Sequence, residues 1–273
     1  TPLHSSAASD VYKRQAKETM IPSIEFRGVS KFFGNIIALK DISFKVFKGE
    51  ITALLGDNGA GKSTLIKLLS GVHMPSEGEI LLSGEPVNFK SPRQAVSAGI
   101  GTVYQDLALQ PLMSVTRNFF LGREITKGLF LNMPLMNTIT KKEMAKLGID
   151  VADPTQPIGT MSGGQRQTLA IARAIYFGAN VLILDEPTSA LGQKQQLEVL
   201  RTIKKVKELG DIAIIFITHN DMHAKLLGDR FAFLNRGKVL AEGSRDEIDM
   251  NNLRPLMAGG AELEKLETEF SGR

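Results

Sequence analysis

A glycine-rich stretch at residues 56–63 has the residue types and spacing of a phosphate-binding loop. It reads GDNGAGKS and fits the pattern G-x-x-x-x-G-K-[ST], between an apolar stretch and a segment with leucines at helical spacing. Its glycines let successive N–H groups point into one concavity, and the helix that follows adds its positive end. Lys62 supplies a cation to the β- and γ-phosphates and Ser63 a hydroxyl to Mg²⁺, which favours an ATP site over a plain glycine-rich turn. The residues expected to hold ATP here are Gly56, Asn58, Gly59, Ala60, Gly61, Lys62, Ser63 and Thr64.

A second candidate lies where the apolar stretch Val181–Leu184 ends in Asp185 and Glu186. Two adjacent acids after a buried strand are costly unless they have partners, and the carboxyl edge of a parallel sheet is where ligands bind. We expect Asp185 to hold Mg²⁺, directly or through water. Strand alternation places Glu186 on the other side, where we expect it to polarise the attacking water. The alternative for this pair is an ordinary acidic turn.

Between these two motifs, residues 161–167 (MSGGQRQ) resemble the signature motif of ATP-binding-cassette (ABC) ATPases. Gln105 matches the Q-loop of that family, His219 its switch histidine, and Phe33 the aromatic residue that stacks on adenine. The resemblance covers about residues 23–245, with every motif in order. It implies that Gln105 ligates Mg²⁺ and that His219 supports the γ-phosphate and the attacking water. The alternative for Phe33 is a plain core phenylalanine.

The resemblance also implies a fold and an assembly. The fold is α/β, a P-loop NTPase of the ABC ATPase type with a RecA-like parallel-sheet core, an N-terminal antiparallel β subdomain and an inserted helical subdomain. In the family, the signature motif serves the ATP held by the opposite subunit, so the expected partner is a second copy in a head-to-tail ATP sandwich. The signature residues carried over are Ser162, Gly163, Gly164 and Gln165.

Two further features concern contacts with other chains. Many family members have Asp after Ser-Ala-Leu in the D-loop, whereas Gly192 stands at this position here. Apolar residues follow the Q-loop glutamine, and we expect most of them to pack the helical subdomain. The hypothesis for the others is that they line a groove for a cytoplasmic helix of a permease. The residues in question are Leu107, Leu109, Leu112, Met113, Phe119 and Phe120.

Less general features resemble one branch of the family, the single-cassette ATPases of bacterial ribose, xylose, fructose and galactose importers. They are Asp57-Asn58, Gly122-Arg123 and Met257–Gly260. This branch implies ATP hydrolysis at the cytoplasmic face of the inner membrane, a permease as partner and, indirectly, a periplasmic or extracytoplasmic sugar-binding protein. Which sugar is carried stays open. The alternatives are a soluble ABC ATPase acting on ribosomes or DNA, and a nucleotide-binding module without turnover.

Strands and helices alternate along the chain as in a parallel sheet flanked by helices. Buried strands are expected at Ile51–Leu55, Val181–Leu184 and Ile212–Ile217, and helices at Met136–Leu147 and Gln193–Leu209. We assign residues 1–19 to a non-native or disordered leader, 20–250 to the ABC ATPase domain with its helical subdomain at about 107–175, and 251–273 to a C-terminal tail helix.

The composition of the chain argues against several classes of protein. The chain of 273 residues has no cysteine and a formal net charge of +4 that is spread along its length. Neither disulfides nor thiolate metal sites are available. No apolar run approaches the roughly 18 residues of a membrane span, and no basic block marks a nucleic-acid partner.

Overall fold

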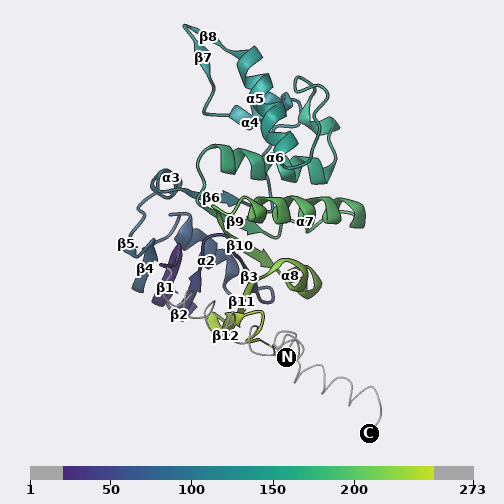
Figure 1. The fold of residues 1–273 in the computed structure, drawn as a ribbon. Coiled ribbons are helices and arrows are strands. Elements are labelled where there is room, and N and C mark those ends of the chain that lie inside the picture. The colour runs from purple at the N-terminus through teal and green to yellow at the C-terminus, as the bar shows by residue number, and fades with distance from the viewer. Residues whose placement is uncertain (1–20, 249–273) are drawn as a thin grey trace, which may run out of the picture.

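The computed structural model describes residues 21–248, so the predictions for the leader at 1–19 and the tail at 251–273 lie outside it. The strands are β1 (Ile24–Phe33), β2 (Ile36–Val46), β3 (Ile51–Leu55), β4 (Glu77–Leu82), β5 (Glu85–Val87), β6 (Ile100–Val103), β7 (Thr126–Lys127), β8 (Phe130–Leu131), β9 (Val181–Asp185), β10 (Ala213–Thr218), β11 (Arg230–Asn235) and β12 (Lys238–Ser244). The helices are α2 (Lys62–Leu69), α3 (Pro92–Ser97), α4 (Val115–Phe120), α5 (Met133–Lys146), α6 (Gly163–Tyr176), α7 (Gln193–Glu208) and α8 (Asp221–Leu227), with a 3₁₀ turn at Ile158–Thr160. Figure 1 shows α4, α5 and the β7–β8 hairpin at one end of the molecule and the strands β1, β2 and β4 at the other.

The larger sheet has the strand order β12-β11-β3-β10-β9-β6, with parallel pairing from β11 to β6 and only β12 antiparallel. Alternate residues of its strands face two different hydrophobic cores. On β10, Ile214 and Phe216 pack in a core with α7, α8 and the helical part, whereas Ile215 and Ile217 pack in a core with α2 and the antiparallel sheet. Burial on both faces explains why these strands are continuous apolar runs.

The parallel registers bring three chain segments to one edge of this sheet. Thr218 pairs with Leu55, and Ile217 pairs with Asp185, so β3, β10 and β9 end side by side. The phosphate loop follows β3, His219 follows β10, and Glu186 follows β9. The predicted chemistry is therefore gathered at the carboxyl edge, as expected for an open parallel sheet.

The smaller sheet is antiparallel, with the order β2-β1-β4-β5. Its inner face carries Phe26 and Phe44, whose rings stack with centroids 4.5 Å apart. These rings pack in the same core as Leu65 and Leu69 of α2. The antiparallel sheet thus holds the helix that starts at the phosphate loop.

The helical part is tied to the segment after Gln105 by one buried amide. The side chain of Asn118, on α4, donates to the carbonyl oxygens of Gln110, Met113 and Ser114 and accepts from the Gln110 N–H. Ser114 caps the same helix by accepting from the Arg117 N–H. The loop between β6 and α4 therefore has a defined shape without regular hydrogen bonding.

The predicted fold class is confirmed, and β3 has the predicted bounds. The sequence reasoning missed α3, α8 and the β7–β8 hairpin, which lies inside the stretch predicted to be helical. The domain boundaries at 20–250 and 107–175 stay predictions. No helix between residues 21 and 248 is long and apolar enough to cross a membrane.

Candidate active site

The phosphate loop closes around its own lysine. The Lys62 ammonium donates to the carbonyl oxygens of Gly56 and, at 3.1 Å, of Asp57. Lys62 is only 8% exposed although it carries a charge. Gly61 precedes α2 without any side-chain cap, so the first N–H groups of that helix have no capping partner. The loop therefore offers a buried cation and backbone donors to an anion.

A cavity of about 560 Å³ lies over this loop. Its walls combine the loop with Gln105, which follows β6, and with the two acids at the end of β9. The predicted site residues that line it are Asn58, Gly59, Gly61, Lys62, Ser63, Thr64, Gln105, Asp185 and Glu186. Gly56 and Ala60 belong to the loop but are not among the lining residues.

Glu186 connects two of the other predicted groups. Its carboxylate oxygens lie 4.0 Å from Lys62 Nζ and 2.9 Å from His219 Nδ1. The expectation that Glu186 points to the other side of the strand is wrong, since Asp185 and Glu186 line the same cavity. The reason is that β9 ends at Asp185 and Glu186 has a φ of 48°, which breaks the strand alternation. Such strained non-glycine residues cluster at active sites.

Asp185 occupies a place where ionisation is costly. Burial raises the pKa of its carboxyl above the ordinary value, the charge of Glu186 raises it further, and Lys62 opposes both. Residues 21–248 contain no group of three or more His, Cys, Asp or Glu side chains placed to hold a metal by themselves. A single carboxylate beside a hydroxyl and an amide suits Mg²⁺, which keeps several waters and takes phosphate oxygens as further ligands.

Phe33 lies at the end of β1 and outside the lining of this cavity. It is 41% exposed, its ring forms a T-shaped pair with His73, and the Lys31 ammonium lies 5.1 Å from its centre. This exposure removes the alternative of a core phenylalanine. The ring can therefore offer an apolar face to a purine.

Five cavity-lining residues come from segments that sequence reasoning did not connect with the site. Ile36, Ile37 and Ala38 belong to β2, and Arg236 and Gly237 form the turn between β11 and β12. Ile36 and Ile37 are exposed apolar side chains on β2, and this exposure is visible only in the folded chain. Nothing in the sequence of the β11–β12 turn points to a ligand.

The signature residues do not line the cavity over the phosphate loop. Ser162 and Gln165 form a capping box at the start of α6, in which each side chain bonds the backbone of the other. A Cβ atom on Gly163 would lie 2.6 Å from Leu191 Cδ2, and one on Gly164 would lie 2.9 Å from Glu198 Oε2. The signature is thus a rigid helix start packed against the D-loop and α7.

Gly192 is not required by the local fold. It is the N-cap of α7 with a φ of −67°, and no atom lies within 4 Å of a Cβ placed on it. An Asp at this position would fit and would supply the side-chain cap that the helix lacks.

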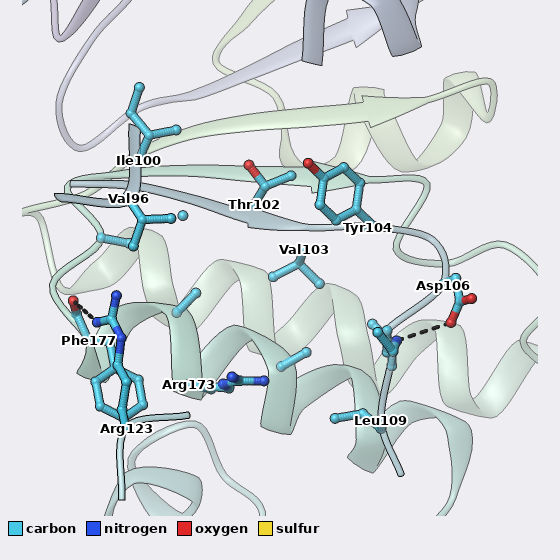
Figure 2. A pocket seen from close by; sticks show the side chains of 16 residues that line it. Val96, Ile100, Thr102, Val103, Tyr104, Asp106, Leu109, Arg123, Arg173 and Phe177 are labelled. Carbon is cyan, nitrogen blue, oxygen red and sulfur yellow. Dashed lines mark hydrogen bonds between the residues drawn. The ribbon is translucent and has the colours of Figure 1, made fainter. Parts of the chain in front are cut away.

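Figure 2 shows a second cavity, of about 320 Å³, between β6, the segment after Gln105 and α6. Leu107 and Leu109 line it, and the Arg123 guanidinium stacks on Phe177 at its edge, 4.9 Å from the ring centre. Arg173, also in the wall, donates to the Leu121 carbonyl at 2.8 Å. The cavity is thus apolar with a cationic rim.

The other apolar residues after Gln105 lie elsewhere. Phe119 and Phe120 are fully buried in the core, as expected for packing of the helical part. Leu112 is almost completely exposed, and neither it nor Met113 lines the second cavity. The groove hypothesis therefore rests on Leu107 and Leu109.

Gly56→Ala should lower the melting temperature more than Gly59→Ala, by at least about 2–4 °C. A Cβ on Gly56 would lie 2.4 Å from the Leu234 carbonyl oxygen, and this backbone group cannot move without disturbing β11. Gly59 also has a positive φ, of 81°, but no atom lies within 4 Å of its Cβ position. Thermal unfolding of both variants measures the difference. Equal melting temperatures would show that the close approach at Gly56 is not essential.

Comparison with known proteins identifies the family of this chain. The family model described as ABC transporter matches residues 39–189. The chain belongs to the ABC transporter family. It is 42% identical over 238 residues to the xylose/arabinose import ATP-binding protein XylG of Sulfolobus acidocaldarius, covering 87% of this chain and 94% of that protein. It is 41% identical over 249 residues to the fructose import ATP-binding protein FrcA of Rhizobium meliloti, covering 88% and 95%.

A third relative of this ABC transporter chain is longer. The ribose import ATP-binding protein RbsA 1 of Rubrobacter xylanophilus is 37% identical over 84% of this chain, which spans only 46% of that protein. All three names are those of import ATP-binding proteins. They give no support to the alternative of an ATPase acting on ribosomes or DNA.

Solved structures agree with the fold. The ATP-binding cassette MJ1267 in its ADP conformation has a TM-score of 0.73 and 25% identity, covering 84% of this chain and 93% of that one. The cassette MJ0796, solved as a dimer in a post-hydrolysis state with ADP and Pi, has a TM-score of 0.66 and 25% identity, covering 81% and 98%.

Proposed function

We propose that this chain is the ATP-binding and ATP-hydrolysing subunit of an ABC importer for a monosaccharide. One observation carries the hydrolytic part, namely that Glu186 lies between Lys62 and His219 at the phosphate loop. A carboxylate at this place can take a proton from water beside the γ-phosphate. The xylose/arabinose and fructose import names of the two relatives of similar length support the transport part.

The phosphate chain of ATP would lie in the loop, with the N–H groups of Gly59 to Thr64 and the Lys62 ammonium as donors. Lys62 would exchange its bonds to the Gly56 and Asp57 carbonyls for bonds to phosphate oxygens. Phosphate is the better acceptor for an ammonium group because the bond is charge-assisted on both sides. The adenine would stack on the exposed ring of Phe33.

Ser63, Gln105 and Asp185 would hold Mg²⁺. All three line the cavity, and their hydroxyl, amide and carboxylate oxygens are ligands that Mg²⁺ accepts. Bound there, the ion would neutralise charge on the phosphates. Its positive charge would also favour the ionised form of Asp185, whose pKa is raised by burial and by Glu186 in the protein alone.

Glu186 would act as the base for the attacking water. The water oxygen forms a bond to the γ-phosphorus, its proton goes to Glu186, and the bond from phosphorus to the bridging oxygen of ADP breaks. His219 contacts Glu186 at 2.9 Å and would hold the carboxylate and donate to the γ-phosphate. Such a reaction depends on positioning and charge stabilisation more than on covalent catalysis.

The second copy would complete each site. Ser162 to Gln165 form the capped start of α6, which does not line the cavity of its own chain. In a head-to-tail pair, this start would face the γ-phosphate on the partner. The dimeric state of the solved MJ0796 cassette supports this arrangement.

The partners beyond the second copy would be a membrane permease and, through it, a periplasmic or extracytoplasmic sugar-binding protein. The chain would act as a peripheral subunit at the cytoplasmic face of the inner membrane. The cavity beside Leu107 and Leu109 would receive a helix of the permease, because it is apolar and lies next to Gln105 in the chain. No nucleic acid is expected to take part.

Leu109→Asp should weaken association with the permease about tenfold or more, since it places a charge against an apolar partner surface. ATP binding should stay unchanged, because Leu109 does not line the cavity over the phosphate loop. Leu240→Asp, at an exposed leucine of β12, is the matched control. Co-purification with the permease measures the first effect and nucleotide titration the second. Loss of both together would contradict the assignment.

Reconstitution tests the function as a whole. Any permease and sugar-binding protein found encoded beside this chain are placed with it in vesicles, and uptake of labelled xylose, ribose, fructose and galactose is compared. We expect ATP-dependent uptake of one sugar, and faster phosphate release when that sugar is present. Phosphate release that no permease or sugar alters would argue against an importer.

A further inference from the structure

A groove of about 410 Å³ lies between α7 and α8, away from both cavities described above. Its floor contains Ile51, the first residue of β3, and its wall contains Asp229, which immediately precedes β11. The groove therefore lies at the amino edge of the parallel sheet. The phosphate loop, Asp185 and His219 lie at the opposite, carboxyl edge.

The groove has apolar walls that are open to solvent. Leu197 of α7 is 51% exposed and Leu226 of α8 is 62% exposed, and both line it. Leu200 and Leu227 beneath them are buried in the core. Two exposed leucines that face one groove form a surface that an apolar partner would cover.

Cations surround these leucines. Arg201, Lys204, Lys207 and Arg245 line the groove together with the acids Glu208 and Asp229. Lys207 is paired with Asp229 at 2.6 Å, and Arg245 donates to the Gly228 carbonyl. Within the described part of the chain, Arg201 and Lys204 have no hydrogen bond or ion pair. The groove therefore carries excess positive charge, and an apolar partner with acidic flanks would fit it.

The last part of the sequence has that chemistry. Residues 261–270 read AELEKLETEF, with four glutamates and one lysine. Leu263, Leu266 and Phe270 follow the spacing i, i+3, i+7, which predicts a helix with one apolar stripe and acids beside it. The segment matches the groove in both respects.

The chain enters this region close to the groove. Arg245 lines it, and the described chain ends three residues later at Ile248, which packs against the same core as Leu200 and Leu227. Twelve residues, 249–260, separate Ile248 from Ala261. They can span up to about 43 Å, whereas α7 is only about 24 Å long. The connection is therefore long enough for any position along the groove.

We propose that residues 261–270 of the same chain bind this groove as an amphipathic helix. Leu263, Leu266 and Phe270 cover Leu197 and Leu226, and the glutamates pair with Arg201 and Lys204. The tail then joins α7, which starts at the D-loop, to α8, which follows His219. This inference does not depend on the proposed transport function.

The absence of cysteine allows a direct test in the full chain. The pair Leu226→Cys and Leu266→Cys should form an intramolecular disulfide under mild oxidation about tenfold faster than the control pair Val72→Cys and Leu266→Cys. Val72 is also an exposed apolar residue, but it follows α2. Migration on a non-reducing gel separates the products. A disulfide-linked dimer would show that the tail of a second copy occupies the groove, and a rate equal to the control would show that no tail does; either result overturns the proposal.

Charge reversal tests the pairing separately. Arg201→Glu with Lys204→Glu should slow the disulfide about tenfold, and adding Glu264→Lys with Glu267→Lys should restore the rate. Arg201 and Lys204 do not line the cavity over the phosphate loop, so nucleotide titration of the first pair should be unchanged and serves as the check on folding. Failure of the second pair to restore the rate, in variants that bind nucleotide normally, would overturn the charge pairing.

Discussion

Glu186→Gln should reduce ATP hydrolysis by at least about 100-fold while ATP binding is retained. Glutamine keeps the size of the side chain but cannot accept a proton from water. It also removes the negative charge that lies 2.9 Å from His219 and 4.0 Å from Lys62. The phosphate loop itself is unchanged, so the nucleotide is still held. The variant should therefore accumulate as an ATP-bound dimer, measured by phosphate release, nucleotide titration and light scattering.

Glu79→Gln is the matched control. It removes an exposed pair with Arg27 on the antiparallel sheet, and such surface pairs contribute little. Hydrolysis by this variant should equal that of the unmodified chain. Hydrolysis by Glu186→Gln within a few fold of the control would remove Glu186 from the role of base.

The sequence predicts local chemistry well where one continuous segment carries it. The phosphate loop needs only β3, the glycines and the start of α2, and all are neighbours in the chain. The apolar run of β3 identifies its bounds because both faces of the strand are buried. The acids at the end of β9 are equally local.

The prediction for Glu186 was wrong because it assumed that strand alternation continues. One residue with a φ of 48° turns the side chain into the cavity beside Asp185. The strain has a local support, since the Glu186 carbonyl accepts from the Ser189 hydroxyl and the Glu186 N–H donates to Ile217. Nothing in the residue types at this position reveals a left-handed backbone.

The missed parts of the site come from long-range contacts. Ile36 and Ile37 reach the cavity because β2 lies beside the phosphate loop in the folded chain, and the β11–β12 turn reaches it through the Gly237 N–H, which donates to the Ala60 carbonyl. The helix α8 was missed because its seven residues are too few for a clear period. Neither the hydrophobic pattern of the sequence nor the secondary-structure propensity of its residues predicts these long-range contacts or so short a helix.

The signature motif of one chain does not reach the phosphate loop of the same chain. The Ser162 hydroxyl accepts a hydrogen bond from the Gln165 N–H, and the signature motif packs on Leu191 rather than on the phosphate loop. The start of α6 therefore has its shape before any nucleotide binds, and it does not contact the phosphate loop of the same chain. In the proposed arrangement, Lys62 and Gly163 belong to two halves of a site that a second copy would bring together.

Lys62→Ala and Gly163→Asp should each abolish hydrolysis when the variant is assayed alone. The first removes the buried cation of the phosphate loop. The second places a carboxylate where the signature would meet phosphate, and its Cβ also collides with Leu191. An equal mixture of the two should regain up to about one quarter of the normal rate, because half of randomly formed pairs are mixed and each has one intact site.

The mixture decides between two arrangements. If each site used the phosphate loop and the signature of the same chain, both chains in every pair would be defective and mixing would restore nothing. The control is each variant alone at the total concentration of the mixture, with melting temperatures to confirm folding. Recovery that rises with protein concentration and requires both variants means that Lys62 of one copy works with Gly163 of the other.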